Sequence, residues 1–132
     1  MKAAVFIAPG QIEVQETAKP EIDSENQAII RVVRASVCGS DLWWYRDIAK
    51  REANTLVGHE AIGVVEQVSA DVSQIKVGDF VIVPFTHGCG HCVACLNGFE
   101  GNCLNQKPGS NGGYQAEFMK YEPADSGLVK IP

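Results

Sequence analysis

Four of the five cysteines fall in one short stretch of the chain. They follow the pattern C-x2-C-x2-C-x7-C, and they are Cys89, Cys92, Cys95 and Cys103. Cysteines two residues apart in a tight turn can aim both sulfurs at one point, and four thiolates form a closed tetrahedral site for Zn²⁺. The spacing therefore predicts a structural zinc site, in which the metal supplies folding energy to a segment that has no core of its own.

Two other uses of these sulfurs stay open. A cubane iron–sulfur cluster also favours C-x2-C-x2-C, but its bacterial ferredoxin form continues with x3-C-P. Here Cys103 comes eight residues after Cys95 and is followed by Leu104. Disulfides are disfavoured in a cytoplasmic setting. His91, which stands between two predicted ligands, is expected to be a neighbour of the sulfurs and not a ligand.

The cysteines stand in a long stretch without a regular apolar pattern. Residues 86–112 are rich in Gly, Asn and Pro, and compact domains rarely keep so long a loop unless something else orders it. We expect a zinc-binding lobe over 86–112. One helical turn is predicted from Cys92 to Asn97, ended by Gly98, because glycine suits the left-handed position after a helix.

The fifth cysteine, Cys38, belongs to a second pair of motifs. Residues 38–41 read Cys-Gly-Ser-Asp, and residues 58–60 read Gly-His-Glu. A lone cysteine is more often a small buried hydrophobe, and a lone histidine is more often a core or surface residue, so neither motif is decisive alone. The motifs become informative because both occur in one chain, in this order, together with the four-cysteine stretch.

Short strands are expected to position these groups. Short strand-like runs bounded by turn residues cover 2–7, 12–14, 27–37, 61–68, 79–83 and 113–121. Many alternate apolar and polar residues, and those over 27–37 and 61–68 are rich in β-branched residues, which is typical of a mainly β protein. The first two stretches predict a hairpin. A short helical turn is expected over 41–45, and Ser40 can cap it because its hydroxyl can accept a hydrogen bond from a first-turn N–H group.

Length and composition exclude several classes of protein. The chain has 132 residues, of which 45% are hydrophobic, and its formal net charge is −5. One globular domain fits this length, and the acidic balance argues against binding along a nucleic-acid backbone. The apolar runs are far shorter than the roughly 20 residues that a membrane span needs, and Pro9 comes too early for a signal peptide. We predict a cytoplasmic protein without nucleic-acid or membrane partners.

The motifs together resemble the N-terminal catalytic domain of the zinc-dependent alcohol dehydrogenases, members of the medium-chain dehydrogenase/reductase family. The resemblance covers essentially the whole chain, including residues 58–65, 77–81 and 113–117. It implies a mainly β, GroES-like fold: a partly open β-barrel over residues 1–132, with short helices and a zinc-binding loop lobe. It also implies that a Rossmann domain, absent from this chain, binds NAD or NADP.

The resemblance further implies roles for single residues. Cys38 and His59 match ligands of a catalytic zinc, and Glu60 matches an acidic residue that can approach the same metal. Ser40 matches the hydroxyl that hydrogen-bonds the substrate oxygen, and Asp41 matches the carboxylate that orients the ligating histidine. The implied protein is a homo-oligomer with one structural and one catalytic zinc. It would interconvert an alcohol or polyol and an aldehyde or ketone, with zinc as Lewis acid.

Three features depart from the family pattern. A further zinc ligand of the family lies beyond Pro132. The chain has no G-x-G-x-x-G segment after a strand, and residues 109–113 read as a turn-rich loop. Trp43 stands where many relatives have a histidine that relays protons. We therefore expect the isolated chain to bind zinc without transferring hydride.

Other classes of function stay open. A zinc-stabilised interaction module would bind one metal and would tolerate Cys38→Ser or His59→Ala in partner binding. A GroES-like chaperone cap would form a ring and has no use for these residues, and relatives that reduce quinones or enoyl groups usually lack them. The aromatic residues 43–45 suit core packing as well as a substrate wall.

Overall fold

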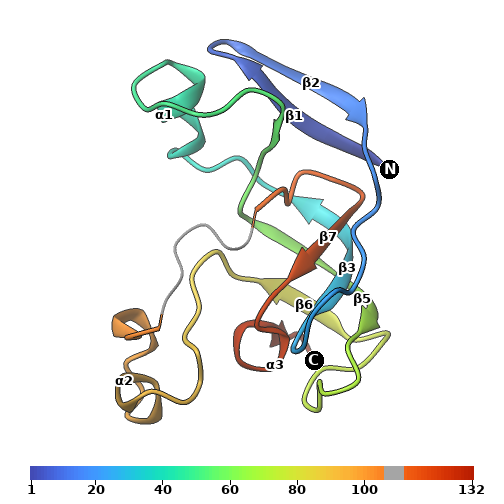
Figure 1. Cartoon of the computed structure of the whole chain (residues 1–132), viewed down its shortest axis with the longest axis vertical. Helices are drawn as coiled ribbons and strands as arrows, with labels where there is room; N and C mark the ends of the chain where they lie inside the picture. The colour runs from blue at the N-terminus through green and yellow to red at the C-terminus, as the bar shows by residue number, and fades with distance from the viewer. Residues whose placement is uncertain (106–111) are drawn as a thin grey trace.

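A computed structural model describes residues 1–105 and 112–132 of the chain. Its strands form two antiparallel sheets (Figure 1). The smaller sheet has the order β2-β1-β4, with β1 at Lys2–Ala8, β2 at Gln11–Glu16 and β4 at Thr55–Leu56. The larger sheet has the order β7-β3-β5-β6-β8, with β3 at Ala28–Ala35, β5 at Ala61–Val68, β6 at Phe80–Val83, β7 at Phe118–Tyr121 and β8 at Val129–Lys130.

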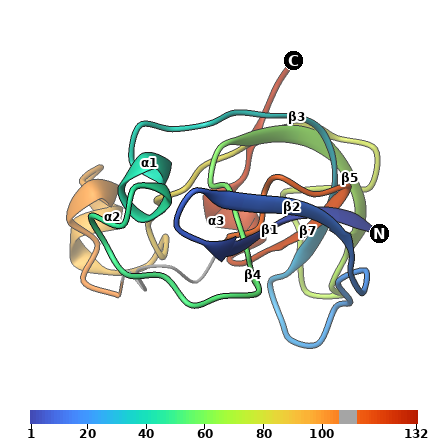
Figure 2. The same cartoon turned by 90° about the horizontal axis from the view of Figure 1, so that it is seen from above.

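The helical segments in the described residues are short. They are α1 at Asp41–Tyr45, α2 at Val93–Leu96, the 3-10 turn η1 at Glu100–Asn102 and α3 at Ala124–Gly127. Both cartoon views place α1 and α2 on the same side of the sheets (Figures 1 and 2). None of the described helices combines the length and the apolar character needed to cross a membrane.

Strand β1 joins the two sheets. Ala3 forms an isolated bridge with Ala116, and the Ala4 N–H donates to the Gln115 carbonyl over 2.8 Å. The two sheets do not close into a complete barrel within the described ranges. The predicted mainly β, partly open architecture is therefore confirmed.

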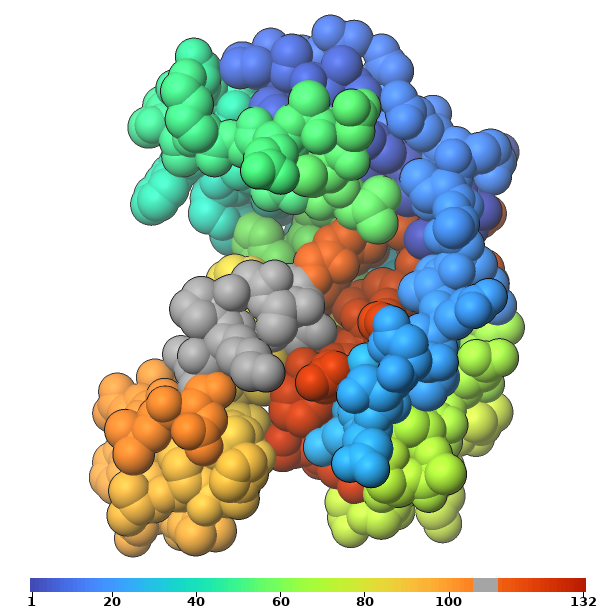
Figure 3. Space-filling model, in the orientation of Figure 1, coloured from blue at the N-terminus to red at the C-terminus, as the bar shows by residue number. Residues whose placement is uncertain are grey.

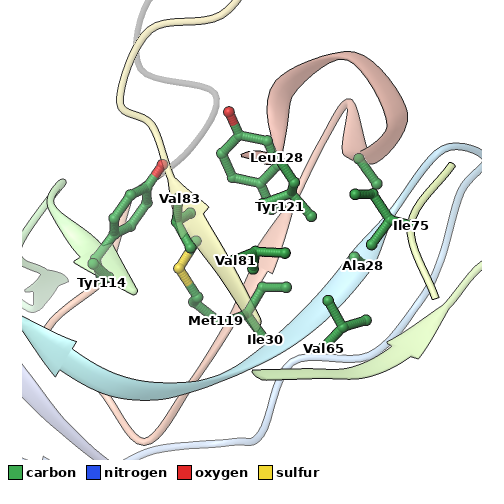
Figure 4. Close-up of a cluster of buried hydrophobic side chains, with 12 residues drawn as sticks. Ala28, Ile30, Val65, Ile75, Val81, Val83, Tyr114, Met119, Tyr121 and Leu128 are labelled. Carbon is green, nitrogen blue, oxygen red and sulfur yellow. The ribbon is translucent and has the colours of Figure 1, made fainter. Parts of the chain in front are cut away.

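The main core covers one face of the larger sheet (Figure 4). In β5 the burial alternates, so that Ala61, Gly63 and Val65 are buried between half-exposed neighbours. Such a period of two is the property of strands that made β5 predictable. A second, smaller cluster of Phe6, Trp44 and Val57 packs α1 against β1.

The expected strands are largely confirmed, including the β1–β2 hairpin. The strand expected over 113–121 is wrong in its first half, since only Phe118–Tyr121 forms β7. Gly113 adopts φ +77°, and the next residues run across to β1. The sequence pattern misses β4, β8, η1 and α3 because segments of two to four residues are too short to show a period.

Gly58 is the position at which the chain turns into the Gly-His-Glu motif. Its φ is +94°, and a Cβ atom there would lie 2.6 Å from Cγ and 2.8 Å from the backbone nitrogen of Gln115. The Gln115 N–H donates to the Val57 carbonyl at 3.1 Å, which explains the close approach. Only glycine suits this position, because both the backbone angle and the space exclude a side chain.

We expect Gly58→Ala to lower the free energy of unfolding by about 2–4 kcal/mol, as the sum of left-handed strain and overpacking. Urea denaturation measures this loss. Gly10→Ala is the matched control, because Gly10 has φ +79° but no atom within 4 Å of a Cβ there; it should lose about 1 kcal/mol. Equal losses in the two variants would contradict the close approach of Gly58 and Gln115.

Candidate metal centres

The pairing of β3 with β5 brings the two distant motifs together. Ala35 at the end of β3 pairs with Ala61 at the start of β5, and the Ser36 N–H donates to the Glu60 carbonyl over 3.0 Å. Cys38 comes three residues after β3, and Glu60 comes directly before β5. Antiparallel strands place these two chain ends at the same edge of the sheet.

Three metal-binding side chains meet at that edge. The Cys38 sulfur, a His59 ring nitrogen and a Glu60 carboxylate oxygen all lie within 4.8 Å of one another. Cys38 and His59 are half-buried, whereas Glu60 is exposed. Thiolate, imidazole and carboxylate are the donors that Zn²⁺ accepts in proteins. The donor set and its spacing fit one zinc ion.

Asp41 holds two members of this group in place. Its side chain is only 7% exposed; Oδ2 accepts the Cys38 backbone N–H at 3.0 Å, and Oδ1 lies 3.3 Å from His59 Nδ1. A hydrogen on Nδ1 would point at this carboxylate, and in that tautomer Nε2 is the ring nitrogen that can bind a metal. The structure thus brings the predicted Asp41 and His59 together.

Ser40 lies on the other side of the imidazole. Its Oγ is 3.3 Å from His59 Nε2. The expected N-cap of α1 is wrong, because the Ser40 hydroxyl makes no capping hydrogen bond. The backbone of Ser40 is already helical, with φ −68° and ψ −24°, whereas a capping residue needs an extended conformation. The hydroxyl is therefore available to the metal-binding group.

A cleft of about 610 Å³ opens at this group. Cys38, Ser40, His59 and Glu60 line one part of it, and most of the remaining wall is apolar, including Ile62, Ile82, Val83, Pro84 and Phe85. The ring centroids of Phe85 and His59 are 4.7 Å apart. Apolar clefts with a few convergent polar groups are typical small-molecule sites.

The aromatic residues 43–45 do not line this cleft. Trp44 is buried and contacts Phe6 edge to face, with ring centroids 5.1 Å apart. Trp43 and Tyr45 are exposed. Of the two roles left open for the cluster, core packing is therefore the one that Trp44 has.

The four remaining cysteines form a second cluster of candidate metal ligands in the lobe around α2. Cys92 Sγ lies 3.4 Å from Cys95 Sγ and 4.0 Å from Cys103 Sγ, and Cys89 Sγ lies 4.0 Å from Cys95 Sγ. Four sulfurs arranged tetrahedrally at about 2.3 Å from zinc would be roughly 3.8 Å apart. All five cysteines of the chain are free thiols. The cluster therefore fits a zinc ion.

The lobe is held by local turns and protrudes from the body of the molecule (Figure 3, lower left). The expected helical turn forms as α2, and Gly98 follows it at φ +78°. A Cβ at Gly88 would lie 2.7 Å from Cys95 Sγ, so glycine leaves room for the sulfurs. His91 Nδ1 lies 2.8 Å from the Cys89 carbonyl. Residues 106–111 of the predicted lobe, and most of the loop at 109–113, fall outside the described residues.

The thiols of the lobe differ in acidity. Backbone N–H groups, first that of His91, lower the pKa of Cys89 to about 6, and the N–H of Cys95 is the first cause that lowers the pKa of Cys92. Burial raises the pKa of Cys95 to about 12. At neutral pH Cys89 thus favours its thiolate form, while Cys95 must release a proton when a metal binds.

One residue beside the Cys38 group escaped the sequence-based prediction. Arg51 lines a second cavity of about 340 Å³ together with Asp41 and His59. It stands in a charge-rich stretch, Asp47 to Glu52, in which no spacing distinguishes it. Only the folded chain shows that it faces the site.

Comparison with known proteins places the chain in a family. The alcohol dehydrogenase GroES-like domain matches residues 24–132. Zinc-type alcohol dehydrogenase B of Aspergillus flavus is 34% identical over 100% of this chain and 32% of its own length. The glutathione-independent formaldehyde dehydrogenase of Pseudomonas aeruginosa is 32% identical over 99% of this chain and 37% of its own length.

A solved structure agrees with these matches. The alcohol dehydrogenase TADH from Thermus sp. ATN1 superposes with a TM-score of 0.91 and 30% identity, over 100% of this chain and 40% of that chain. The chain therefore belongs to the alcohol dehydrogenase GroES-like domain family. It spans 32% to 47% of the length of the curated relatives it matches.

The acidity of the lobe thiols has a measurable consequence. In metal-free protein we expect iodoacetamide to label Cys89 with a rate that rises through about pH 6, because its thiolate forms above its lowered pKa. Cys95 should react last. Peptide mapping after timed labelling measures both rates.

The urea-unfolded chain is the control for this labelling, since all its thiols should titrate near the ordinary pKa of about 8.5. Bound Zn²⁺ should protect the four lobe cysteines together. A midpoint for Cys89 near 8.5 in the folded protein would contradict the proposed N–H···S bonds.

Proposed function

We propose that this chain is the zinc-binding catalytic domain of an alcohol dehydrogenase. The enzyme would interconvert an alcohol or polyol and an aldehyde or ketone, with NAD or NADP as hydride carrier. The observation that carries the proposal is the meeting of the Cys38, His59 and Glu60 donors within 4.8 Å at the mouth of an apolar cleft. Relatives named zinc-type alcohol dehydrogenases support this class of reaction.

Each residue of the group has a role in the proposed reaction. Cys38 and His59 would hold the catalytic zinc, and Glu60 would lie within reach of the same ion. Zinc supplies Lewis acidity, which stabilises negative charge on the substrate oxygen. Asp41, whose Oδ1 lies 3.3 Å from His59 Nδ1, would keep the hydrogen on that nitrogen. Ser40 Oγ, 3.3 Å from His59 Nε2, would hydrogen-bond the substrate oxygen, and it would pass its own hydroxyl proton to water as it takes the proton of the substrate.

The cleft would select and shield the substrate. Its mostly apolar wall, with Ile82 and Phe85, suits the carbon skeleton of a small alcohol and displaces water from the reacting carbon. Exclusion of water strengthens every charge interaction at the polar end of the cleft. The apolar part of the lining would thus bind the substrate, and the polar part would carry out the reaction.

The four lobe cysteines would hold a structural zinc, closed to substrate. We propose that residues 1–132 act as one domain with the lobe at 86–112. The Rossmann cofactor domain would lie elsewhere in the protein, as the greater length of the relatives supports. Free thiols as metal ligands suit a reducing compartment, so a cytoplasmic enzyme is proposed. Assembly as a homo-oligomer is part of the same proposal.

A zinc-stabilised interaction module is the second candidate. One observation favours it: the lobe exposes four large apolar side chains, namely Val93, Leu96, Phe99 and Leu104. Apolar groups gathered on one surface are typical of protein contacts. This function gives no reason for the second donor group, and so it accounts for less of the structure.

Metal content separates the two candidates. We expect elemental mass spectrometry to find two zinc ions per wild-type chain and one in Cys38→Ser. The Cys38 group has fewer ligands than the four-cysteine lobe, and so the loss of one thiolate should empty it. Ser36→Ala is the matched control, since Ser36 lines the same cleft but offers no ligand; it should keep both ions. A single zinc that Cys38→Ser leaves in place would favour the interaction module.

Cobalt substitution tests whether the two sites differ in openness. A catalytic zinc site keeps a coordination position free, whereas a four-cysteine site has none. We expect imidazole to change the visible spectrum of Co²⁺ bound at Cys38 and His59, measured in a Cys95→Ser variant. The spectrum of the lobe, measured in Cys38→Ser, should stay unchanged. A response of the lobe spectrum alone would contradict the assignment.

A further inference from the structure

We infer that Arg51 is a positioning residue for the Cys38–His59–Glu60 group. Its guanidinium joins the two chain segments that carry these ligands and faces the carboxylate of Asp41. The inference rests on the proposed function of the group as a metal site.

The guanidinium is fixed first to the segment that leads into His59. Arg51 Nε donates to Thr55 Oγ1 at 2.9 Å, and Nη2 donates to the Leu56 carbonyl. Thr55 Oγ1 in turn donates to the Glu52 carbonyl at 2.8 Å. These bonds hold the planar group in one orientation beside β4, three residues before His59.

The same guanidinium reaches the segment that carries Cys38. Arg51 Cζ lies 4.8 Å from the ring centroid of Trp44, a distance at which a cation is attracted to an aromatic face. Trp44 belongs to α1, whose first residue is Asp41. Arg51 therefore spans from β4 to α1, across the cavity that also exposes His59.

The positive charge of Arg51 compensates the buried carboxylate of Asp41. Asp41 is almost buried, and a buried carboxylate needs compensation by hydrogen bonds or an opposite charge. Burial lowers the pKa of Arg51, and attraction to Asp41 opposes that change. Arg51 and Asp41 are the two ionic side chains in the lining of the cavity, beside the imidazole of His59. The cation thus favours the negative carboxylate in the place where it meets Cys38 N–H and His59 Nδ1.

Loss of the cation should act on one metal site only. Without Arg51, Asp41 would lose its facing charge and His59 would be held less firmly. Changes to groups that orient a ligating histidine typically weaken metal binding about 10–100-fold. The four-cysteine lobe takes no ligand from α1 or β4, and so it serves as an internal reference in the same molecule.

Titration of the metal-free chain with Co²⁺, followed by visible absorption, tests the inference. We expect Arg51→Met to weaken binding at the Cys38 group by about 10–100-fold and to leave the lobe affinity within about twofold of wild type. Arg51→Lys, which keeps the charge without the planar fork, should restore part of the loss. Arg46→Met, at an exposed arginine just after α1, is the control and should bind both ions as wild type does.

The outcomes separate this inference from the proposed function. A wild-type chain that binds Co²⁺ in the lobe alone would overturn the proposed function. Two ions bound with unchanged affinities in Arg51→Met would overturn the role of Arg51 and leave the function intact. Equal weakening of both sites would assign Arg51 to the fold and also overturn the inference. If Arg51→Met does not fold, the same comparison of the two sites in Arg51→Lys decides.

Discussion

Ala35 of β3 pairs with Ala61 of β5, and this antiparallel register decides where every residue of the Cys38 group lies. A Cβ on Gly63 would lie 2.5 Å from the Arg31 carbonyl oxygen, so only glycine at position 63 leaves room for β3 to lie this close to β5. A shift by one residue would turn the buried face of β5 outward. The same register buries the core face of β5 and places the residues of the site. The free energy of core burial therefore also holds the geometry of the site.

The two groups of candidate metal ligands depend on the fold in opposite ways. The lobe gathers four sulfurs from one short stretch through tight turns, and it keeps most of its apolar side chains exposed. Its order would come from the metal itself. The Cys38 group instead takes its donors from two chain segments that meet at one edge of the larger sheet. Asp41 holds the group from α1, and we infer that Arg51, bonded to β4, supports it. Its geometry is set by the protein before any metal binds.

Sequence patterns predicted the features that repeat or that follow a fixed spacing. Strand β3 is rich in β-branched residues, the burial of β5 alternates with a period of two, and the lobe cysteines have the spacing of a metal site. Contacts between segments that are distant in the chain produce no periodicity or spacing in the sequence. Ser40 reads as a helix cap but has a helical backbone, and Arg51 reads as one more surface charge. The meeting of Cys38 with His59 was expected only from a family resemblance, because local pattern says nothing of strand register.

An anomalous difference map at the zinc absorption edge, from crystals of the zinc-loaded chain, tests the central claim most directly. The account predicts two peaks: one surrounded by the sulfurs of Cys89, Cys92, Cys95 and Cys103, and one between Cys38 Sγ and His59 Nε2. The second should show a shorter bond to nitrogen, about 2.0–2.1 Å, than to sulfur, about 2.3 Å. A map with the lobe peak alone, or with a second peak away from Cys38 and His59, would contradict it.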